Sequence, residues 1–322
     1  MIRRCLALLI GLLATASAGA LELRMLMAWD ESYPAVRYVA ERYARKVDEA
    51  SHGEVTFALT GPAAIPAFEQ LQPVVLGIFD LLLTHGAYHL DTTGIGLALD
   101  AIHAGPRGLR ESGVWDAVDR SYQTHGLKLL ALPIVRAGYQ LFLRDPIGPD
   151  CTLRGRRIRA SPSYAALLGG LGAQALMLPI GEVHAALAHK QVDGVAWSTI
   201  GTLPYQWYEV SRYLMRPTFG TVTHLLLMNL DTWQHLPLDL QRLLLEQGDE
   251  LENTAYKRFK KVAGSEENEL SVAGMQVTTL CLRQAEQLPR YWADSVWQIA
   301  IEHAGDEARA LREMARKSGL TP

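Results

Sequence analysis

The chain contains 322 residues, of which 20% are charged, and carries a formal net charge of −3 at pH 7. This length is typical of about two domains of ordinary size, each large enough to bury a hydrophobic core. The mildly acidic balance gives no support for a nucleic-acid partner, because proteins that bind nucleic acid concentrate Lys and Arg on one face.

The first segment of the chain has the order of a secretory signal peptide. A basic start precedes an apolar run over residues 5–13, and small residues follow that run. The pattern predicts cleavage near Ala18 or Ala20, which would remove residues 1–20 and export the mature protein from the cytoplasm. A membrane anchor is the alternative, but the apolar run is short for a bilayer core of about 30 Å.

The first half of the mature chain alternates between strand and helix patterns. Residues 21–27 alternate like a strand, and apolar residues then recur at helical spacing up to Ala50. Strand patterns at 55–59 and 79–83 enclose a short helix at about 68–76. This β-α-β-α-β order predicts an α/β domain with a largely parallel sheet.

The same rhythm returns after residue 150. We predict strands and helices in alternation, at 157–159, 164–171, 175–178, 181–189, 192–198 and 222–228. From Leu238 to about Ala273 the chain is rich in helix formers and has few breakers, and further helices are expected over 282–317. At 1.5 Å per residue the long helix would extend about 50 Å, which is enough to brace two lobes.

Enzyme signatures are scarce in this sequence. It lacks a G-x-S-x-G elbow, an H-E-x-x-H pair, a phosphate-binding P-loop and a G-x-G-x-x-G turn that opens a helix. His85 and His89 have a spacing that would place two metal ligands on one helix face, but a loop is the favoured interpretation there. We therefore expect no catalytic residues, no metal ion and no cofactor.

Two cysteines remain beyond the signal segment, Cys151 and Cys281. In an oxidising compartment they could form a disulfide, or they could stay as two buried thiols, and the sequence leaves both alternatives open. Neither belongs to a C-x-x-C pair, which makes a zinc or redox role a weak interpretation.

Three segments share an informative pattern of residues and spacing. They read Leu-Arg-Gly-Arg-Arg-Ile-Arg at 153–159, Leu-Pro-Ile-Gly-Glu-Val-His-Ala-Ala-Leu at 178–187 and Gln-Val-Asp-Gly at 191–194. In order and spacing they closely resemble the solute-binding proteins of TRAP transporters, the DctP family, whose hallmark reads roughly D-L-x-G-x-K-I-R, P-x-x-E-V-Y-x-A-L and G-x-V-D-G. The resemblance extends over nearly the whole mature chain, with further matches at Ser51–Val55 and Glu69–Asp80.

The resemblance implies a two-lobed periplasmic binding protein fold, α/β and type II-like, with the long helix bracing both lobes. Lobe I would comprise residues 21–140 plus 225–262, and lobe II residues 141–224 plus 263–322, with the C-terminal helices free to pack back on lobe I. A ligand would be buried between the lobes, which close by hinge motion. The implied location is the periplasm, and the implied partners are a small organic acid and the small and large TRAP membrane subunits. We expect a monomer.

In the family, the arginine that ends the K-I-R motif grips the substrate carboxylate, and Arg159 occupies that position. A guanidinium suits this role because its planar fork pairs with a carboxylate through two hydrogen bonds and stays charged when water is excluded. The alternative is a surface arginine within a basic run. Strand alternation places Arg157 on the same face, so periodicity does not choose between the two.

Trp197 is the second candidate, four residues after Asp193. Some keto-acid-binding relatives place a tryptophan here with a preceding glutamate that helps to hold a metal ion. This chain has Ala196 instead, which puts that metal site in doubt. A tryptophan at the pocket would offer a flat apolar wall and one N–H donor, whereas a core tryptophan is the competing interpretation.

Five more residues are inferred from the resemblance. His224 matches a histidine that some relatives direct at the ligand from a hinge strand, although a core histidine with satisfied hydrogen bonds is an equal alternative. Glu69 falls where relatives use a polar contact, and Trp29 lies at the family's first ligand-contacting loop. Tyr139 occupies the place of the family's second arginine, with Arg136 three residues earlier.

Trp29, Trp197 and Tyr139 together favour a monocarboxylate with an apolar or aromatic body over a polar sugar acid. Two other classes of function stay open: a binding protein that serves a different transporter or a sensor, and, less favoured, an exported enzyme on the same scaffold. An enzyme would need a nucleophile–base pair in the cleft, and we find none among these residues.

Overall fold

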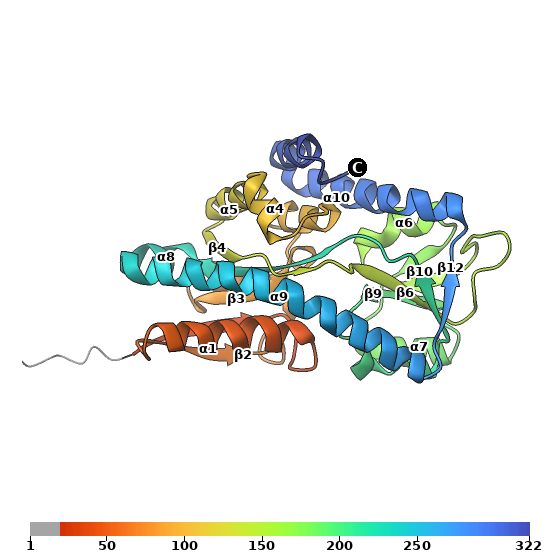
Figure 1. Cartoon of the computed structure of the whole chain (residues 1–322), viewed down its shortest axis with the longest axis horizontal. Helices are drawn as coiled ribbons and strands as arrows, with labels where there is room; N and C mark the ends of the chain where they lie inside the picture. The colour runs from red at the N-terminus through yellow and green to blue at the C-terminus, as the bar shows by residue number, and fades with distance from the viewer. Residues whose placement is uncertain (1–19) are drawn as a thin grey trace, which may run out of the picture.

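The computed structural model describes residues 20–322 of the chain. The predicted signal peptide therefore lies, except for its last residue, outside the described part, and so does the predicted cleavage site at Ala18. Within the described range no helix is both long and apolar enough to cross a membrane. The residues form two six-stranded sheets flanked by helices, which confirms the α/β class (Figure 1).

The first sheet has the strand order β2-β1-β3-β11-β4, with β5 paired to β11. Its strands are β1 (Leu21–Met27), β2 (Val55–Thr60), β3 (Leu81–His85), β4 (Leu127–Ala131), β5 (Ile134–Val135) and β11 (Val222–Asn229). Strand β1 runs parallel to β2 and β3, but β11 runs antiparallel to β3, β4 and β5. The prediction of a largely parallel sheet is therefore confirmed for β1, β2 and β3, whereas β11, which enters from the distant second half of the chain, runs in the opposite direction.

The second sheet has the order β12-β10-β6-β9-β7-β8. Its strands are β6 (Tyr139–Leu143), β7 (Arg157–Arg159), β8 (Gln174–Leu176), β9 (Gly194–Ser198), β10 (Tyr213–Arg216) and β12 (Gln276–Thr279). The strands predicted at 157–159, 175–178 and 192–198 are present as β7, β8 and β9, which pair in parallel as the sequence rhythm indicated. Strand β6 pairs antiparallel to β9 and β10, so this sheet is mixed as well.

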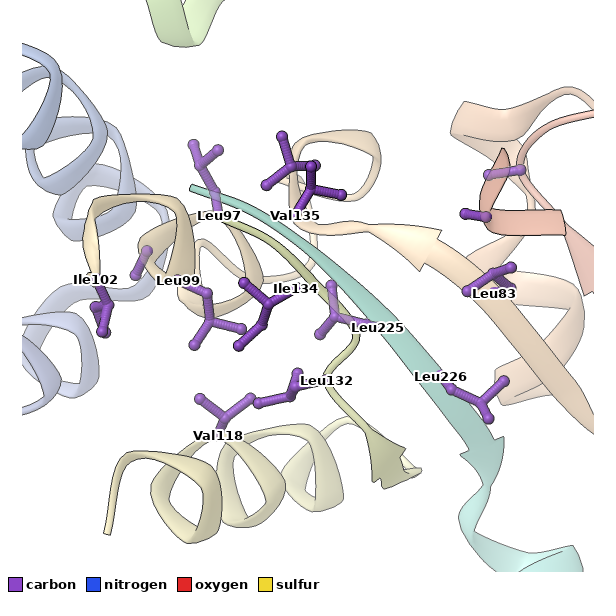
Figure 2. Packing of buried hydrophobic residues seen from close by; sticks show 14 of the residues in the cluster. Leu83, Leu97, Leu99, Ile102, Val118, Leu132, Ile134, Val135, Leu225 and Leu226 are labelled. Atoms are coloured by element: carbon purple, nitrogen blue, oxygen red, sulfur yellow. The ribbon is translucent and has the colours of Figure 1, made fainter. Parts of the chain in front are cut away.

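Ten α-helices are found within residues 20–322. They are α1 (Glu41–Ala50), α2 (Leu71–Val75), α3 (Ile95–Ala98), α4 (Pro106–Glu111), α5 (Val114–Thr124), α6 (Ala165–Gly170), α7 (Val183–Ala188), α8 (Leu230–His235), α9 (Leu238–Val272) and α10 (Leu282–Lys317). Strand β11 is buried along its whole length because helices cover both faces of its sheet, as expected for an uninterrupted apolar strand. Figure 2 shows Leu225 and Leu226 of β11 in this core, with Val118 of α5 pointing towards Leu132.

The chain crosses between the sheets three times: through α8 and α9, which connect β11 to β12, and through two adjacent segments, one between β5 and β6 and the other between β10 and β11. The segments pair with each other through a bridge between Tyr139 and Phe219. A Cβ atom on Gly138 would lie 2.3 Å from the carbonyl oxygens of Phe219 and Gly220, so only glycine permits this approach. The predicted lobe boundaries at 140 and 224 lie close to these crossings, and the division into lobes stays a prediction.

Helix α9 runs diagonally across both sheets, from the region of β3 and β4 to α7 (Figure 1). Two buried glutamates attach it. Glu252 accepts hydrogen bonds from the Leu132 amide (2.7 Å) and the Trp115 indole (2.8 Å), on the side of the first sheet. Glu266, 14 residues further along, accepts from the amides of Gly201 (2.7 Å) and Thr202 (3.0 Å), which follow β9 of the second sheet. The helix is thus fixed to both halves of the molecule.

Helix α10 begins at the second sheet and packs on α6, α3 and α5, so it also touches both halves (Figure 1). Gly305 interrupts it with a left-handed φ of 51°. The residue before α10, Cys281, forms a disulfide with Cys151, and the two Cα atoms are 5.6 Å apart. The two cysteines therefore pair, which is one of the alternatives that the sequence left open.

We predict that Glu266→Ala lowers the free energy of unfolding by about 2–4 kcal/mol, because it leaves two buried backbone N–H groups and the Thr202 hydroxyl without their acceptor. Urea unfolding measures this loss. The matched control is Glu269→Ala on the exposed face of the same helix, which should change the stability by less than about 0.5 kcal/mol. Equal losses in the two variants would contradict the role given to Glu266.

Candidate functional site

Arg159 is the last residue of β7 and is partly buried. Its Nε donates to the carbonyl oxygen of Leu178 (3.0 Å), and its guanidinium carbon lies 5.5 Å from the ring centre of Trp197. Within residues 20–322 no carboxylate forms an ion pair with it; the ionisable groups that influence it are tyrosines. The described chain therefore presents here a partly desolvated cation with no anionic partner.

The neighbouring arginine, which strand periodicity did not separate from Arg159, has different surroundings. Arg157 is about half exposed, its Nε lies 3.8 Å from an Asp193 carboxylate oxygen, and its Nη2 donates to the carbonyl oxygen of Lys190 (2.7 Å). Arg157 thus stabilises the turn before β9, while Arg159 is left without a carboxylate partner. The structure separates the two positions, and the ligand role of Arg159 stays a prediction.

Three tyrosines influence the charge of the Arg159 guanidinium. Burial lowers the pKa of this group, and the neighbouring hydroxyls of Tyr164, Tyr88 and Tyr205 oppose that shift. Burial also raises the pKa of Tyr205 to about 12 and raises that of Tyr88, so both hydroxyls are neutral at ordinary pH. Neutral hydroxyls can solvate a cation, but they do not neutralise it.

These tyrosines share one topological position, which the sequence analysis did not use. Tyr88, Tyr164 and Tyr205 each end a short 3-10 helix, and the three helices follow β3, β7 and β9 within a few residues. Trp29 follows β1 in the same way. The carboxyl ends of strands are where α/β sheets bind ligands, so an aromatic residue just after a predicted strand is the signal that could have found them.

Aromatic side chains from both halves of the chain form the walls around Arg159. On the side of the first sheet, the ring centre of Tyr88 lies 5.6 Å from Trp29 and 4.8 Å from Phe68. On the side of the second sheet, the ring of Tyr205 lies 5.7 Å from that of Trp197. These faces are flat and apolar with a few polar tips, which suits an apolar or aromatic body joined to an anionic group.

The Trp197 indole has one further property. Its Nε1–H is buried and has no hydrogen-bond partner in the described part of the chain. An N–H group that is buried without an acceptor costs about 1–3 kcal/mol, so buried donors are normally paired. Close to a cation that has no anionic partner, this donor points to a ligand with a second acceptor atom.

His224 lies in β11 beneath the Trp29 side of this cluster, with the two ring centres 5.2 Å apart. The ring is fully buried, and both of its nitrogens are in use. Nδ1 donates to the carbonyl oxygen of Pro133 (3.3 Å), and Nε2 accepts from the Tyr33 hydroxyl (3.2 Å). His224 therefore supports Trp29 and Tyr33 from below, and a direct ligand contact would require one of these bonds to break.

Tyr139 is placed at the crossing between the sheets, and its hydroxyl is already used. It donates to the buried carboxylate of Asp100 (2.5 Å), and its ring packs on Tyr164, with 5.3 Å between the ring centres. Tyr164 is one of the tyrosines that influence Arg159. Tyr139 is thus next to the candidate site but separated from Arg159 by a neighbour.

The structure does not bring the last two predicted residues into this cluster. Glu69 is exposed, whereas its neighbour Gln70 is fully buried and donates to the carbonyl oxygen of Met27 (3.0 Å). Arg136 is exposed and donates to the hydroxyl of Tyr256 in α9 (3.2 Å). Their assignment to the ligand site stays a prediction without support from the geometry.

No cluster of three or more His, Cys, Asp or Glu side chains able to hold a metal ion occurs among residues 20–322. At the position where some relatives would use a metal-binding glutamate, Ala196 is buried in the second sheet. His85 and His89 also have different hydrogen-bond partners: His85 Nε2 contacts Asp100 (3.0 Å), and His89 Nε2 contacts the Tyr122 hydroxyl (2.6 Å).

Residues 27–302 of the chain match the protein family described as bacterial extracellular solute-binding protein, family 7 (DctP). The ectoine-binding periplasmic protein TeaA from Halomonas elongata is 26% identical over 198 residues. That alignment covers 59% of this chain and spans 56% of the length of TeaA.

Solved structures resemble the whole two-sheet arrangement. A TRAP periplasmic solute-binding protein from Desulfovibrio salexigens with bound orotic acid superposes with a TM-score of 0.80 at 20% identity, over 92% of this chain and 98% of that one. DctP7 from Bordetella pertussis, an extracytoplasmic solute receptor binding pyroglutamic acid, gives a TM-score of 0.78 at 17% identity, over 92% and 100% of the two chains. At such identities the likeness concerns the fold, and it confirms the two-lobed binding-protein fold that the sequence predicted.

We predict that His224→Asn makes the pH dependence of stability shallower. Burial lowers the pKa of His224 to about 3, while an unfolded histidine titrates near about 6.5. Between these values the unfolded chain binds a proton that the folded chain does not, so stability falls as the pH falls, by about 1.4 kcal/mol per pH unit for this residue.

Urea unfolding at pH 7, 6, 5 and 4 measures this slope. The slope should decrease by about 1.4 kcal/mol per pH unit in His224→Asn. It should keep its wild-type value in His235→Asn, because the side chain of His235 is 78% exposed and stays in water in both states. An unchanged slope in His224→Asn would show that this ring is not held neutral by burial.

Proposed function

This chain belongs to family 7 of the bacterial extracellular solute-binding proteins, as its sequence motifs predicted, and we propose that it is the periplasmic component of a TRAP transporter that captures a small organic monocarboxylate through Arg159. One observation carries the proposal: Arg159 is a partly buried cation that has no carboxylate partner among residues 20–322 and is surrounded by neutral aromatic side chains.

A carboxylate is the anion that these surroundings favour. Because the Nε of Arg159 is used by the carbonyl oxygen of Leu178, its two terminal nitrogens are left to donate to a planar anion side by side. A ligand carboxylate there would neutralise a charge that burial already penalises. Such a pair is strong only when water is excluded, which the aromatic walls achieve.

The walls also support a mechanism of capture without chemical change. Trp29 and Tyr88 follow strands of the first sheet, whereas Trp197 and Tyr205 lie in and after β9 of the second sheet. A ligand held by Arg159 would therefore touch both halves and stabilise their closed arrangement. Ligand binding shifts the equilibrium between open and closed forms by the difference in its affinity for them, and the closed form would be presented to the TRAP membrane subunits.

An apolar or aromatic body is the preferred shape for the remainder of the ligand. Flat rings line the site from both sides, and the unpaired Trp197 N–H offers one donor to a second acceptor atom. Two of the structures that resemble this chain hold orotic acid and pyroglutamic acid, which are compact ring compounds with a carboxyl group. We further infer a periplasmic monomer that binds its solute and does not transform it.

Arg159→Ala should abolish acid binding, because it removes the charge and both terminal donors. Losing a buried partner of a charge pair costs about 2–5 kcal/mol, which corresponds to a loss of affinity of at least about 30-fold. A thermal-shift screen of small organic acids against the mature protein measures the response. An acid present at about 100 times its dissociation constant adds about 2.7 kcal/mol of stability to the wild type.

The matched control for this screen is Arg157→Ala, which removes an arginine from the same strand that is paired with Asp193. This variant should respond to the same acids as the wild type. Arg159→Lys should respond weakly, because an ammonium group keeps the positive charge but lacks the two parallel N–H donors of a guanidinium. A full response in Arg159→Ala, or the absence of any response in the wild type, would contradict the proposed carboxylate site.

Trp197→Phe should weaken acid binding by roughly tenfold or less, since it keeps an apolar ring but loses one hydrogen bond worth about 0.5–1.5 kcal/mol. Isothermal titration with the acid that gives the largest thermal shift measures the change. Trp233→Phe is the matched control, because this buried tryptophan belongs to α8, which packs against β4 away from Arg159. The N–H would have no role in recognition if the two variants bound equally well.

A further inference from the structure

A cavity lies at the junction of the two sheets, with a volume of about 560 Å³. It is bordered by both crossing segments through Ala137 and Thr218, by α9 through Ala263 and by the start of α10 through Ala285. None of the residues assigned to the Arg159 site borders it. It therefore lies among the elements that connect the halves and is separate from the aromatic side chains near Arg159.

The cavity has polar groups that the fold does not use. Thr199, which follows β9, is 7% exposed, and its hydroxyl is buried with no hydrogen-bond partner in the described part of the chain. Gln140 of β6 is 3% exposed. Its side-chain oxygen accepts a hydrogen bond from Arg216 Nη1 (3.2 Å), which leaves its amide nitrogen as a further donor. Buried hydroxyl groups are normally paired, so the free hydroxyl of Thr199 calls for a partner.

An ion pair lines another side of this cavity. Arg216, at the end of β10, pairs with Glu267 of α9 through its second terminal nitrogen. The side chain of Glu267 is 54% exposed and that of Arg216 is 20% exposed. Surface ion pairs of this kind contribute only about 0–1 kcal/mol, so a ligand with both charges can compete for both partners.

We propose that this cavity is a second binding site, and that it takes a small zwitterion of the α-amino acid class. The ligand carboxylate accepts hydrogen bonds from Arg216 and from the Thr199 hydroxyl, and its ammonium group pairs with Glu267. Small side chains at Ala263 and Ala285 leave room for the ligand's body. An anion alone would leave Glu267 without its cation, and a cation alone would leave Arg216 without its anion.

The position of the cavity gives such a ligand influence over the lobes. The backbone N–H of Thr199 donates to the carbonyl oxygen of Gly138, within the first crossing segment (2.9 Å), and Thr218 lies in the second. Hinge closure, which rests on the proposed function, would move these walls relative to one another. A zwitterion bound here then favours whichever arrangement it fits better, which couples the two sites.

The binding test uses the mature chain with ¹³C-labelled threonine methyl groups and a panel of glycine, L-alanine, L-proline and L-glutamine, titrated to 10 mM by NMR. Acetate and methylammonium serve as ligands with a single charge. We expect at least one amino acid to shift the Thr199 and Thr218 resonances saturably, and the two single-charge ions to leave them unchanged.

Ala263→Leu, which fills the cavity, and Thr199→Val should each weaken this binding at least tenfold. Thr254→Val, elsewhere on α9, should not.

Lobe closure is followed independently by fluorescence energy transfer between dyes on Glu54→Cys and Gln191→Cys, which lie at exposed positions of the two halves. The bound amino acid should change the transfer efficiency in this protein and not when Ala263→Leu is added. Each variant is compared at equal folded fraction by circular dichroism.

Two outcomes would overturn the proposed site, and a third would overturn its coupling to the lobes. No saturable shift with any amino acid would remove the zwitterion site. Binding that disappears in Arg159→Ala and persists in Ala263→Leu would place the amino acid at the Arg159 site. Binding in the cavity without any change in energy transfer would remove the coupling while keeping the site. Arg159→Ala should bind the amino acid normally, so failure of the acid-binding proposal and failure of this one are distinguishable.

Discussion

The way the two sheets are joined depends on the hydrogen bonds that the carboxylate of Asp100 accepts. It is fully buried and accepts hydrogen bonds from the Tyr139 hydroxyl (2.5 Å), the Thr223 amide (3.1 Å) and His85 Nε2 (3.0 Å). The backbone carbonyl oxygen of the same residue accepts from the Trp292 indole (2.9 Å). One residue thus holds the end of β3, the starts of β6 and β11, and α10. A buried carboxylate is tolerated only with several such donors, and its removal would leave each of them unpaired.

This junction explains how two sheets with no strand in common are held as one molecule. Glu252 and Glu266 fix α9 to either half, and the Cys151–Cys281 disulfide fastens the start of α10 to the loop before β7. Burial raises the pKa of Glu252, so its charge depends on the donors around it. Two of these attachments use buried carboxylates of α9, and the third is a covalent bond at the start of α10.

The elements with strong local patterns could be predicted from the sequence, and those that depend on distant partners could not. The helix over 238–272 was predicted because 35 residues without strong breakers have few other options. The antiparallel entry of β11 was missed, since strand direction depends on where the chain returns and not on local spacing. The role of Glu266 was missed for the same reason: its partners Gly201 and Thr202 lie 64 or more residues away and donate backbone N–H groups, which leave no mark on composition.

The candidate site shows the same limit at the level of single residues. Period-2 alternation placed Arg157 and Arg159 on one face, and only the folded surroundings separate them, because Asp193 reaches the first and no carboxylate reaches the second. Family resemblance selected Arg159, but it did not lead to Tyr88, whose neutral hydroxyl lies near the guanidinium. A site with an acidic neighbour would hold its arginine in an internal ion pair, and a ligand would have to displace that partner. Neutral aromatic neighbours leave Arg159 without an internal ion pair, so the carboxylate that we propose as its ligand would gain the full interaction.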